Sequence, residues 1–299
     1  DEVLVDESRF LGSVRLNGSD IAVGVSIRRS TFSGVGDGER LGLHADDLTC
    51  ARLALIQVNV DGAVQAARVR VGGDLVITGC TFSDPGRRAL DLAGASVGEA
   101  IDIQHTTVQG ALSAVRAEVG VGVVLDHVGV DVGVDVGVGV GVDRTGLSES
   151  VDRLPALAMR GIRVQGEFTA SELRTRGEIA LDDAALGSVH VDDVVALAAR
   201  RPDRPTDADP VLVFDAHDAE IAGVIDLDRL RVEAIDGAEA VVDLSGMQAT
   251  TLDVPGGEVI VDLRDARVRT LAIDRDDTAH MILEGFAFGV GALFPVRGR

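Results

Sequence analysis

The sequence predicts an all-β fold: a single-stranded parallel β-helix that completes one coil in about 22 residues. Three recurring features support this prediction. Apolar residues stand at offsets 0, 2 and 7 of an eleven-residue unit, a small or apolar residue usually stands at offset 5, and Gly recurs at offset 9. The pattern is clearest where units starting at Leu90, Ile101 and Leu112 follow one another without interruption. A continuous register of this kind indicates a solenoid rather than a globular core.

Each unit predicts two short strands, because an apolar residue at every second position places one face of a strand in the core. The Gly at offset 9 is expected at a corner that needs positive φ or a close backbone approach. Members of that glycine set include Gly12, Gly34, Gly62, Gly73, Gly110, Gly166, Gly177 and Gly223. The register also fits units starting at Val3, Val14, Val25, Leu41, Leu53, Val64, Leu75, Leu157, Ile179, Phe214, Ile225 and Val261.

The interruptions of the register indicate how many units make a coil. If the unit at Val3 is counted as the first, the interruptions all follow odd-numbered units, which start at Val25, Leu75, Val123, Val189 and Ile225. If one coil holds two units, every insertion leaves the solenoid from the same edge, as loops of repeat proteins tend to do. We therefore expect four short strands per coil and about eleven coils, right-handed, in a rod roughly 50 Å long at a strand spacing of ~4.8 Å.

The continuous register predicts one domain over residues 1–299, with loops inserted at 132–156 and 194–210 and a C-terminal cap at 284–299. The segment DDVVALAARRPDRP in the second loop predicts one or two helical turns that end at Pro. The tail, which is rich in Phe, departs from the register and is expected to close that end of the rod. The first residue is Asp and the register already runs at Val3, so we expect the chain to be part of a longer or processed protein.

Charge and composition limit the partners. The chain has 49 acidic residues against 28 basic ones, all of them Arg, and a net charge of −21. Such a surface repels polyanions, so direct nucleic-acid or anionic-membrane binding is not expected. Apolar stretches are all shorter than the ~18 residues of a membrane span, so we expect no membrane segment in this chain. Cys50 is expected at a corner and Cys80 in the core without a disulfide, which slightly favours a reducing, cytoplasmic location.

Two histidines are candidate metal ligands. His105 and His127 share offset 4 and lie 22 residues apart, so they should stack on adjacent coils. Paired imidazoles can share a metal ion. Because the register places no carboxylate or Cys at a repeating ligand position beside them, we expect an exposed stack and no metal or other cofactor.

Acidic ladders form the candidate interaction surface. Asp243 and Asp262 share one offset, as do Asp226 and Asp253, so the C-terminal third should carry carboxylates in register on two faces. Two interpretations remain open: a binding stripe, or a solvated outer face that discourages edge-to-edge aggregation. The second loop adds a local positive cluster, which could bind a partner or complement a helix end. Its members are Arg200, Arg201 and Arg204.

The segment LDLAGASVGEAIDIQHTTVQGAL, residues 90–112, is similar to pentapeptide-repeat solenoids, with one extra residue per unit. More closely, the chain resembles a group of actinobacterial repeat proteins labelled membrane-associated oxidoreductases, whose repeats end in an LEGF-like segment, here Leu283 to Phe286. In that group a membrane region tends to follow the repeats, so the resemblance implies the soluble repeat part of a membrane-anchored protein. No residues support the oxidoreductase label: GVGDGER at 34–40 lacks the spacing of a dinucleotide fingerprint.

Three classes of function remain. The favoured one is a non-catalytic scaffold that binds a protein partner or assembles with itself. The resemblance to pentapeptide-repeat proteins implies a second, an acidic DNA-mimic rod that occupies the groove of a DNA-processing enzyme. The third, a carbohydrate-active β-helix enzyme, needs convergent carboxylates and often aromatic platforms, and this chain has no Trp and no Tyr. We therefore expect no catalytic residue.

Overall fold

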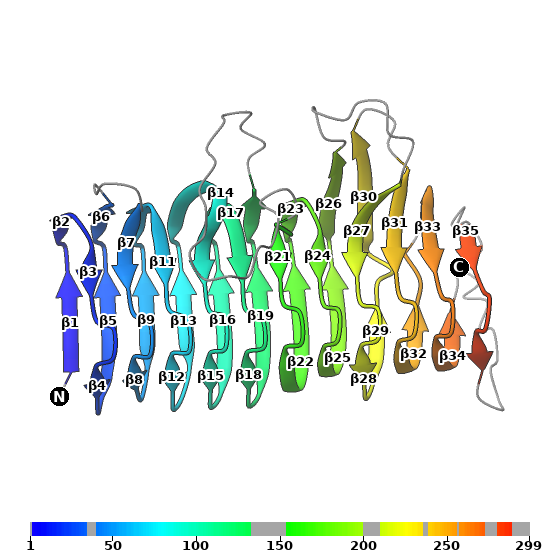
Figure 1. Cartoon of the computed structure of the whole chain (residues 1–299), viewed down its shortest axis with the longest axis horizontal. Coiled ribbons are helices and arrows are strands. Elements are labelled where there is room, and N and C mark those ends of the chain that lie inside the picture. The colour runs from blue at the N-terminus through cyan, green and yellow to red at the C-terminus, as the bar shows by residue number, and fades with distance from the viewer. Residues whose placement is uncertain are drawn as a thin grey trace, which may run out of the picture.

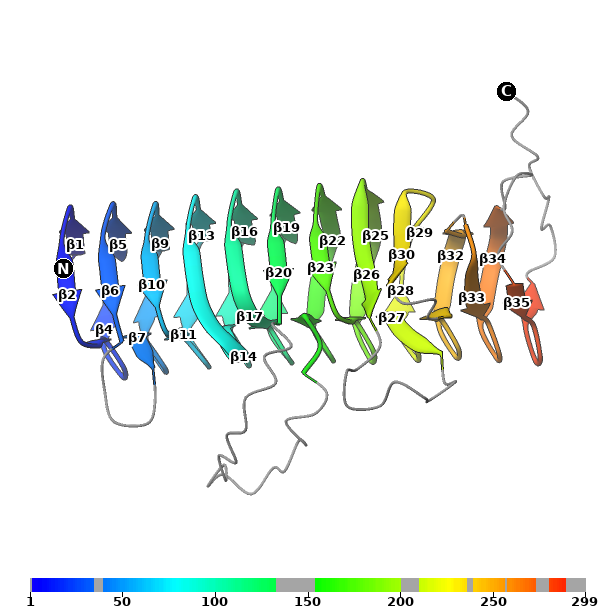
Figure 2. The same ribbon diagram turned by 90° about the horizontal axis from the view of Figure 1, so that it is seen from above.

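The computed structural model describes residues 2–34, 40–132, 154–199, 210–235, 239–255, 257–272 and 280–288, and it is an all-β parallel solenoid (Figure 1). Its strands form two sheets of 18 strands each. Figure 2 shows the successive coils side by side along the long axis. Ala100 pairs with Gly122 and Gln104 with Asp126, which is the predicted step of 22 residues. The predicted all-β parallel solenoid and its step of 22 residues are therefore confirmed.

The coils contribute strands at four positions. One sheet contains the first and fourth positions, and the other contains the second and third. The first position is occupied by β1 (Glu2–Asp6), β5 (Gly24–Arg28), β9 (Leu53–Ile56), β13 (Leu75–Thr78), β16 (Ala100–Gln104), β19 (Gly122–Asp126), β22 (Arg163–Ser171), β25 (Ala185–Asp192), β29 (Val224–Asp226), β32 (Gln248–Asp253) and β34 (Arg267–Ala272). The second is occupied by β2 (Arg9–Leu11), β6 (Thr31–Ser33), β10 (Asn59–Asp61), β14 (Thr81–Asp91), β17 (Thr107–Ser113), β20 (Gly129–Asp131), β23 (Arg174–Arg176), β26 (Val194–Ala199) and β30 (Leu230–Ile235).

The third position is occupied by β3 (Val14–Arg15), β7 (Leu41–His44), β11 (Ala63–Gln65), the ends of β14 and β17, β21 (Leu157–Ala158), β24 (Ile179–Ala180), β27 (Val211–Asp215), β31 (Ala240–Asp243), β33 (Val259–Asp262) and β35 (His280–Ile282). The fourth is occupied by β4 (Asp20–Ile21), β8 (Thr49–Cys50), β12 (Arg70–Val71), β15 (Ser96–Val97), β18 (Glu118–Val119), the starts of β22, β25, β32 and β34, β28 (Glu220–Ile221) and β36 (Ala287–Phe288).

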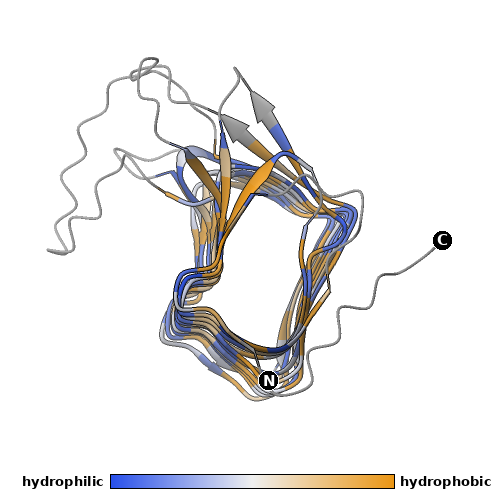
Figure 3. Ribbon diagram, turned by 90° about the vertical axis from the view of Figure 1, so that its right-hand side faces the viewer, coloured by the Kyte–Doolittle hydropathy of each residue, from blue (hydrophilic) through white to orange (hydrophobic). Residues whose placement is uncertain are grey.

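The core is a narrow column of apolar side chains along the axis. Figure 3 looks along that axis and shows the coils superimposed around it. The largest side chains in the core are Phe32, Phe82, Phe168 and Phe214, each at most 1 % exposed. Burying an aromatic or aliphatic side chain contributes roughly 1.5–3 kcal/mol, and each coil packs on its two neighbours, so stability is distributed along the rod.

The corner glycines take both predicted forms. Gly12, Gly62, Gly110 and Gly177 have φ between 127° and 138°, which a side chain rarely tolerates. Gly166 instead lies so close to the preceding coil that a Cβ would stand 2.1 Å from the carbonyl oxygen of Val121. Cys50 differs from the prediction: it ends β8 inside the core, and both free thiols are buried. Burial raises the pKa of the Cys50 and Cys80 thiols to about 11.

The insertions all leave at one edge, as predicted. They fall between β6 and β7, inside β14, between β20 and β21, between β26 and β27, and between β30 and β31 (Figure 1). The expected helix in the second loop is wrong for its first part, because Val194–Ala199 forms strand β26. That strand pairs on both sides, with β23 and β30, and buries Val194 and Ala196. Pairing and burial outweigh the weak helical preference of this Ala-rich segment.

The expected departure of the tail from the register begins later than predicted. Ala287–Phe288 still pairs with Arg267–Val268 as β36 against β34, and Phe286 packs partly against the core. The far end of the cap predicted over 284–299 cannot be placed, because residues 289–299 lie outside the described residues. Most of the loop at 132–156 also lies outside them.

Candidate functional site

From β1 to β25, the residue that follows each first-position strand turns the chain at an outer corner of the solenoid. His105 and His127 adopt the left-handed conformation there, with φ of 47° and 51°, as do Glu172 and Asp193. Because the coils stack in register, these residues form a file of neighbouring side chains on the surface, here called the corner file. Its members are Glu7, Arg29, Gln57, Gly79, His105, His127, Glu172 and Asp193.

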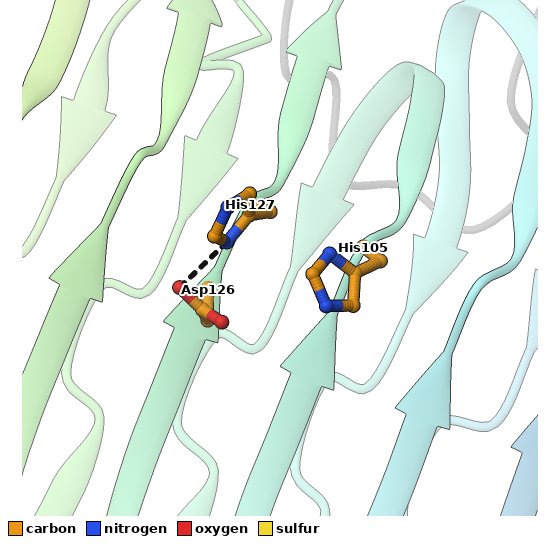
Figure 4. A group of neighbouring side chains, drawn as sticks. All are labelled: His105, Asp126 and His127. Atoms are coloured by element: carbon orange, nitrogen blue, oxygen red, sulfur yellow. Dashed lines mark hydrogen bonds and ion pairs between the residues drawn. The ribbon is translucent and has the colours of Figure 1, made fainter.

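The two histidines lie side by side, as the 22-residue step predicts. Their ring centroids are 4.7 Å apart, and the rings are tilted by 51° (Figure 4). The expected absence of a neighbouring carboxylate is wrong. Asp126 Oδ1 lies 2.9 Å from His127 Nδ1, and Glu172 Oε2 lies 2.9 Å from His127 Nε2.

The sequence did not reveal these acidic neighbours for two reasons. Asp126 precedes His127 directly, and side chains of consecutive residues in a strand point to opposite faces. The chain turns here, however, and the left-handed backbone of His127 brings its ring back to the Asp126 carboxylate. Glu172 belongs to the next coil, whose residues are displaced in the sequence by the insertion that precedes β21.

Asp126 is held in place by the same neighbouring coil. Ser171 Oγ donates a hydrogen bond to Asp126 Oδ1 at 2.6 Å across a sequence separation of 45 residues. This hydrogen bond, together with the one from His127, lowers the pKa of Asp126. The carboxylate is therefore ionised at neutral pH and fixed in orientation.

A shallow acidic groove continues from this point. It is lined by five carboxylates and two guanidinium groups, with Ser171 at its edge: Asp126, Ser171, Glu172, Asp192, Asp193, Asp228, Arg229 and Arg231. Arg229 lies 2.5 Å from Asp192 Oδ1, and Arg231 lies 3.1 Å from Asp193 Oδ1. The carboxylates outnumber the guanidinium groups, so the groove attracts cationic groups. Its side chains come from the ends of β19, β22 and β25 and the start of β30.

The predicted acidic ladders exist, and much of their role is structural. Asp243 pairs with Asp262, and Asp226 pairs with Asp253. At the corner after the third strand, carboxylates accept the backbone N–H two residues later, which closes an Asx turn. This contact measures 2.9–3.1 Å at Asp91, Asp215, Asp243 and Asp262.

One ladder carboxylate, Asp262, does not belong to a solvated face, since it is only 5 % exposed; Asp215 at the same corner is buried to the same extent. Burial alone would disfavour the charge on Asp262, but hydrogen bonds from Arg264 outweigh it and lower the pKa. Asp215 Oδ1 also lies 2.8 Å from His217 Nδ1. The predicted positive cluster cannot be placed, because Arg200, Arg201 and Arg204 lie outside the described residues.

A partly buried ion-pair network lies at the corner after the third strand, one coil before Asp215. Arg160 lies 2.9 Å from Asp182 Oδ1 and 3.1 Å from Glu178 Oε1. Burial raises the pKa of both carboxyl groups in spite of the arginine. These contacts join β21 and β24 and form a structural network rather than an open site.

Searches against protein-family models, curated proteins and solved structures find no match for this chain. The geometry described above therefore carries the functional argument. In the described ranges, no helix is long and apolar enough to cross a membrane.

Proposed function

We propose that this chain is a non-catalytic protein-interaction scaffold, a right-handed solenoid of about eleven coils that binds a basic segment of a partner protein. The acidic groove carries the proposal. It presents five carboxylates from neighbouring coils along one line of the surface, with two guanidinium groups in the same lining. A peptide rich in Arg or Lys fits this chemistry, since bidentate and charge-assisted hydrogen bonds to carboxylates are the strong ones.

The resemblance to repeat proteins with a following membrane region supports the further proposal that such a scaffold lies in the cytoplasm, anchored through a region outside this chain. We rank this function above a DNA mimic because the acidic ladders are partly neutralised. Asp262 is bound by Arg264, and the carboxylates of Asp243 and Asp262 are engaged by their own turns. A mimic of duplex DNA needs continuous, unpaired charge on two sides.

The test is a pull-down from a lysate of the producing organism, read by mass spectrometry. The groove variant combines Asp192→Asn, Asp193→Asn and Asp228→Asn. The matched control removes the same charge far from the groove, with Asp20→Asn, Asp46→Asn and Asp47→Asn in the first coils. We expect a basic protein that the wild type and the control retain and the groove variant loses. Retention by all three would refute the groove, and capture of a DNA-processing enzyme would favour the mimic.

A further inference from the structure

The histidine pair of the corner file has ligand chemistry that a protein-binding scaffold does not require. Ligand atoms of His105, Asp126 and His127 all lie within 4.8 Å of one another. Both rings are exposed and Asp126 is half-buried, so an ion can reach them from solvent (Figure 4). We propose that these three side chains bind one divalent transition-metal ion of the imidazole-preferring class, with Zn²⁺ as its representative.

The donor set selects the class of ion. Two imidazoles and one carboxylate suit Zn²⁺, Ni²⁺ and Cu²⁺, whereas Mg²⁺ and Ca²⁺ prefer oxygen donors alone. Tetrahedral zinc with Zn–N bonds of about 2.0–2.1 Å needs donor atoms roughly 3.3 Å apart. The donor atoms of the three side chains lie within 4.8 Å of one another, and Asp126 Oδ1 is 2.9 Å from His127 Nδ1, so the site has the dimensions of a zinc coordination sphere.

The backbone under these ligands is held by the coils. The N–H of His105 donates to the carbonyl of Asp126 at 2.9 Å, and the N–H of His127 donates to the carbonyl of Ser171 at 3.0 Å. The carboxylate ligand has a supporting partner in Ser171, as ligating carboxylates in metal sites usually do. Glu172, beside His127, stands where a fourth ligand or a hydrogen-bond acceptor for the outer nitrogen is needed.

The second group of potential ligands is a weaker site. Asp215, His217 and Asp243 also bring their donor atoms within 4.8 Å, but they include only one imidazole. The Asp215 oxygen nearest the ring already accepts the His217 N–H, and Asp243 accepts two hydrogen bonds from Ser245. A metal there would have to break the turns of two coils. Asp126 is engaged too, but by the side chains of Ser171 and His127, so a metal at the corner file would break no backbone turn.

The alternative at the first site is a purely electrostatic one, in which a protonated His127 bridges Asp126 and Glu172 as an ion pair. Metal titration of the full chain separates the two. We expect isothermal titration with ZnCl₂ to give one Zn²⁺ per chain. His105→Asn and His127→Asn should each weaken binding at least about tenfold, and Ser171→Ala should weaken it about tenfold through the loss of carboxylate support. Asn is the replacement of choice because it tolerates the left-handed backbone.

Two control variants locate the site. His44 lies 3.2 Å from Asp46, so it offers an imidazole and a carboxylate without a second imidazole. His44→Asn and His217→Asn should leave the Zn²⁺ affinity unchanged. Far-UV circular dichroism checks that every variant keeps its strands, and Ni²⁺ should broaden the ring-proton NMR signals of His105 and His127 first. Absence of zinc binding by the wild type, equal affinity in the double variant His105→Asn/His127→Asn, or loss of binding in His217→Asn would each overturn the proposal.

Discussion

A single methyl group at Gly98 should separate two coils. Gly98 stacks on Gly72 of the preceding coil, and a Cβ on Gly98 would stand 2.1 Å from the Gly72 carbonyl oxygen and 2.9 Å from its carbonyl carbon. Real Cβ contacts stay above 3.0 Å, so in Gly98→Ala the neighbouring backbone must withdraw by about 0.9 Å. Two hydrogen bonds flank that carbonyl: Gly98 N–H to Val71 at 2.8 Å and Glu99 N–H to Gly73 at 3.2 Å. Such a displacement takes both beyond the normal range.

The expected cost follows from these two bonds. Each backbone hydrogen bond contributes about 1 kcal/mol net, and overpacking strain adds about 1–3 kcal/mol. We expect Gly98→Ala to destabilise the solenoid by roughly 3 kcal/mol. The matched control is Gly129→Ala, where a Cβ meets nothing within 4 Å and φ is not positive. That change should be neutral or slightly stabilising, because it restricts the unfolded chain.

The assay is urea denaturation followed by far-UV circular dichroism, since the chain has no Trp or Tyr for fluorescence. Because stability in a solenoid is distributed over neighbouring coils, amide hydrogen exchange should show the loss concentrated in β12, β15 and β18. Equal midpoints for Gly98→Ala and Gly129→Ala would refute the reasoning that the stacked glycines set the coil spacing at this corner.

The remaining predictions concern a titrating side chain, the core and the corner file. Burial lowers the pKa of His217, but Asp215 and the neighbouring carboxylates more than compensate, so the pKa in the native state is raised above 6.5. The resulting stabilisation is fully present below the pKa of the unfolded state and is lost as the pH rises through the pKa of the native state. His217→Asn should therefore lower the free energy of unfolding at pH 5.5 but not at pH 9, with His280→Asn as the control. Phe168→Ala, at a side chain 1 % exposed, should cost about 3–5 kcal/mol in urea titrations, whereas Leu11→Ala, at 80 % exposed, should cost little. The triple change Gln57→His, Thr78→Asp and Gly79→His repeats the metal ligands at the equivalent corner and should raise zinc stoichiometry from one to two; unchanged stoichiometry would count against the ligand assignment.

The fold was predictable because its signal is periodic and local. Each unit repeats the same inward side chains, and the parity of the interruptions places the insertions at one edge. The stacked glycines were only partly predictable. Gly98 and Gly120 stand one position before the predicted glycine offset, where the close approach of consecutive coils, rather than positive φ, excludes a side chain.

The candidate site was harder to predict because it depends on contacts between coils. The spacing of His105 and His127 is visible in the sequence, but their acidic neighbours are not. Ser171 and Glu172 join the site only after an insertion of unpredictable length has been assigned to an edge. For the acidic ladders, by contrast, the sequence pattern suggested a binding surface where a local structural role is sufficient. Segments such as DAHD, DLSG and DLRD contain an Asp that caps its own turn, and this local role explains the repetition without a binding partner.

The corner file explains how such a regular molecule can hold an irregular site. Inward positions hold mostly Val, Leu, Ile, Ala and Phe because the core is narrow, and the corner after the third strand is restricted by its Asx turns. The left-handed corner after the first strand tolerates Glu, Arg, Gln, Gly, His and Asp alike, because its side chains project into solvent and its backbone is fixed by the neighbouring coils. A change of residue there alters the surface chemistry without altering the coil. Two imidazoles in adjacent coils beside a fixed carboxylate, and an acidic groove beginning at that same carboxylate, therefore arise where the fold leaves the sequence most freedom.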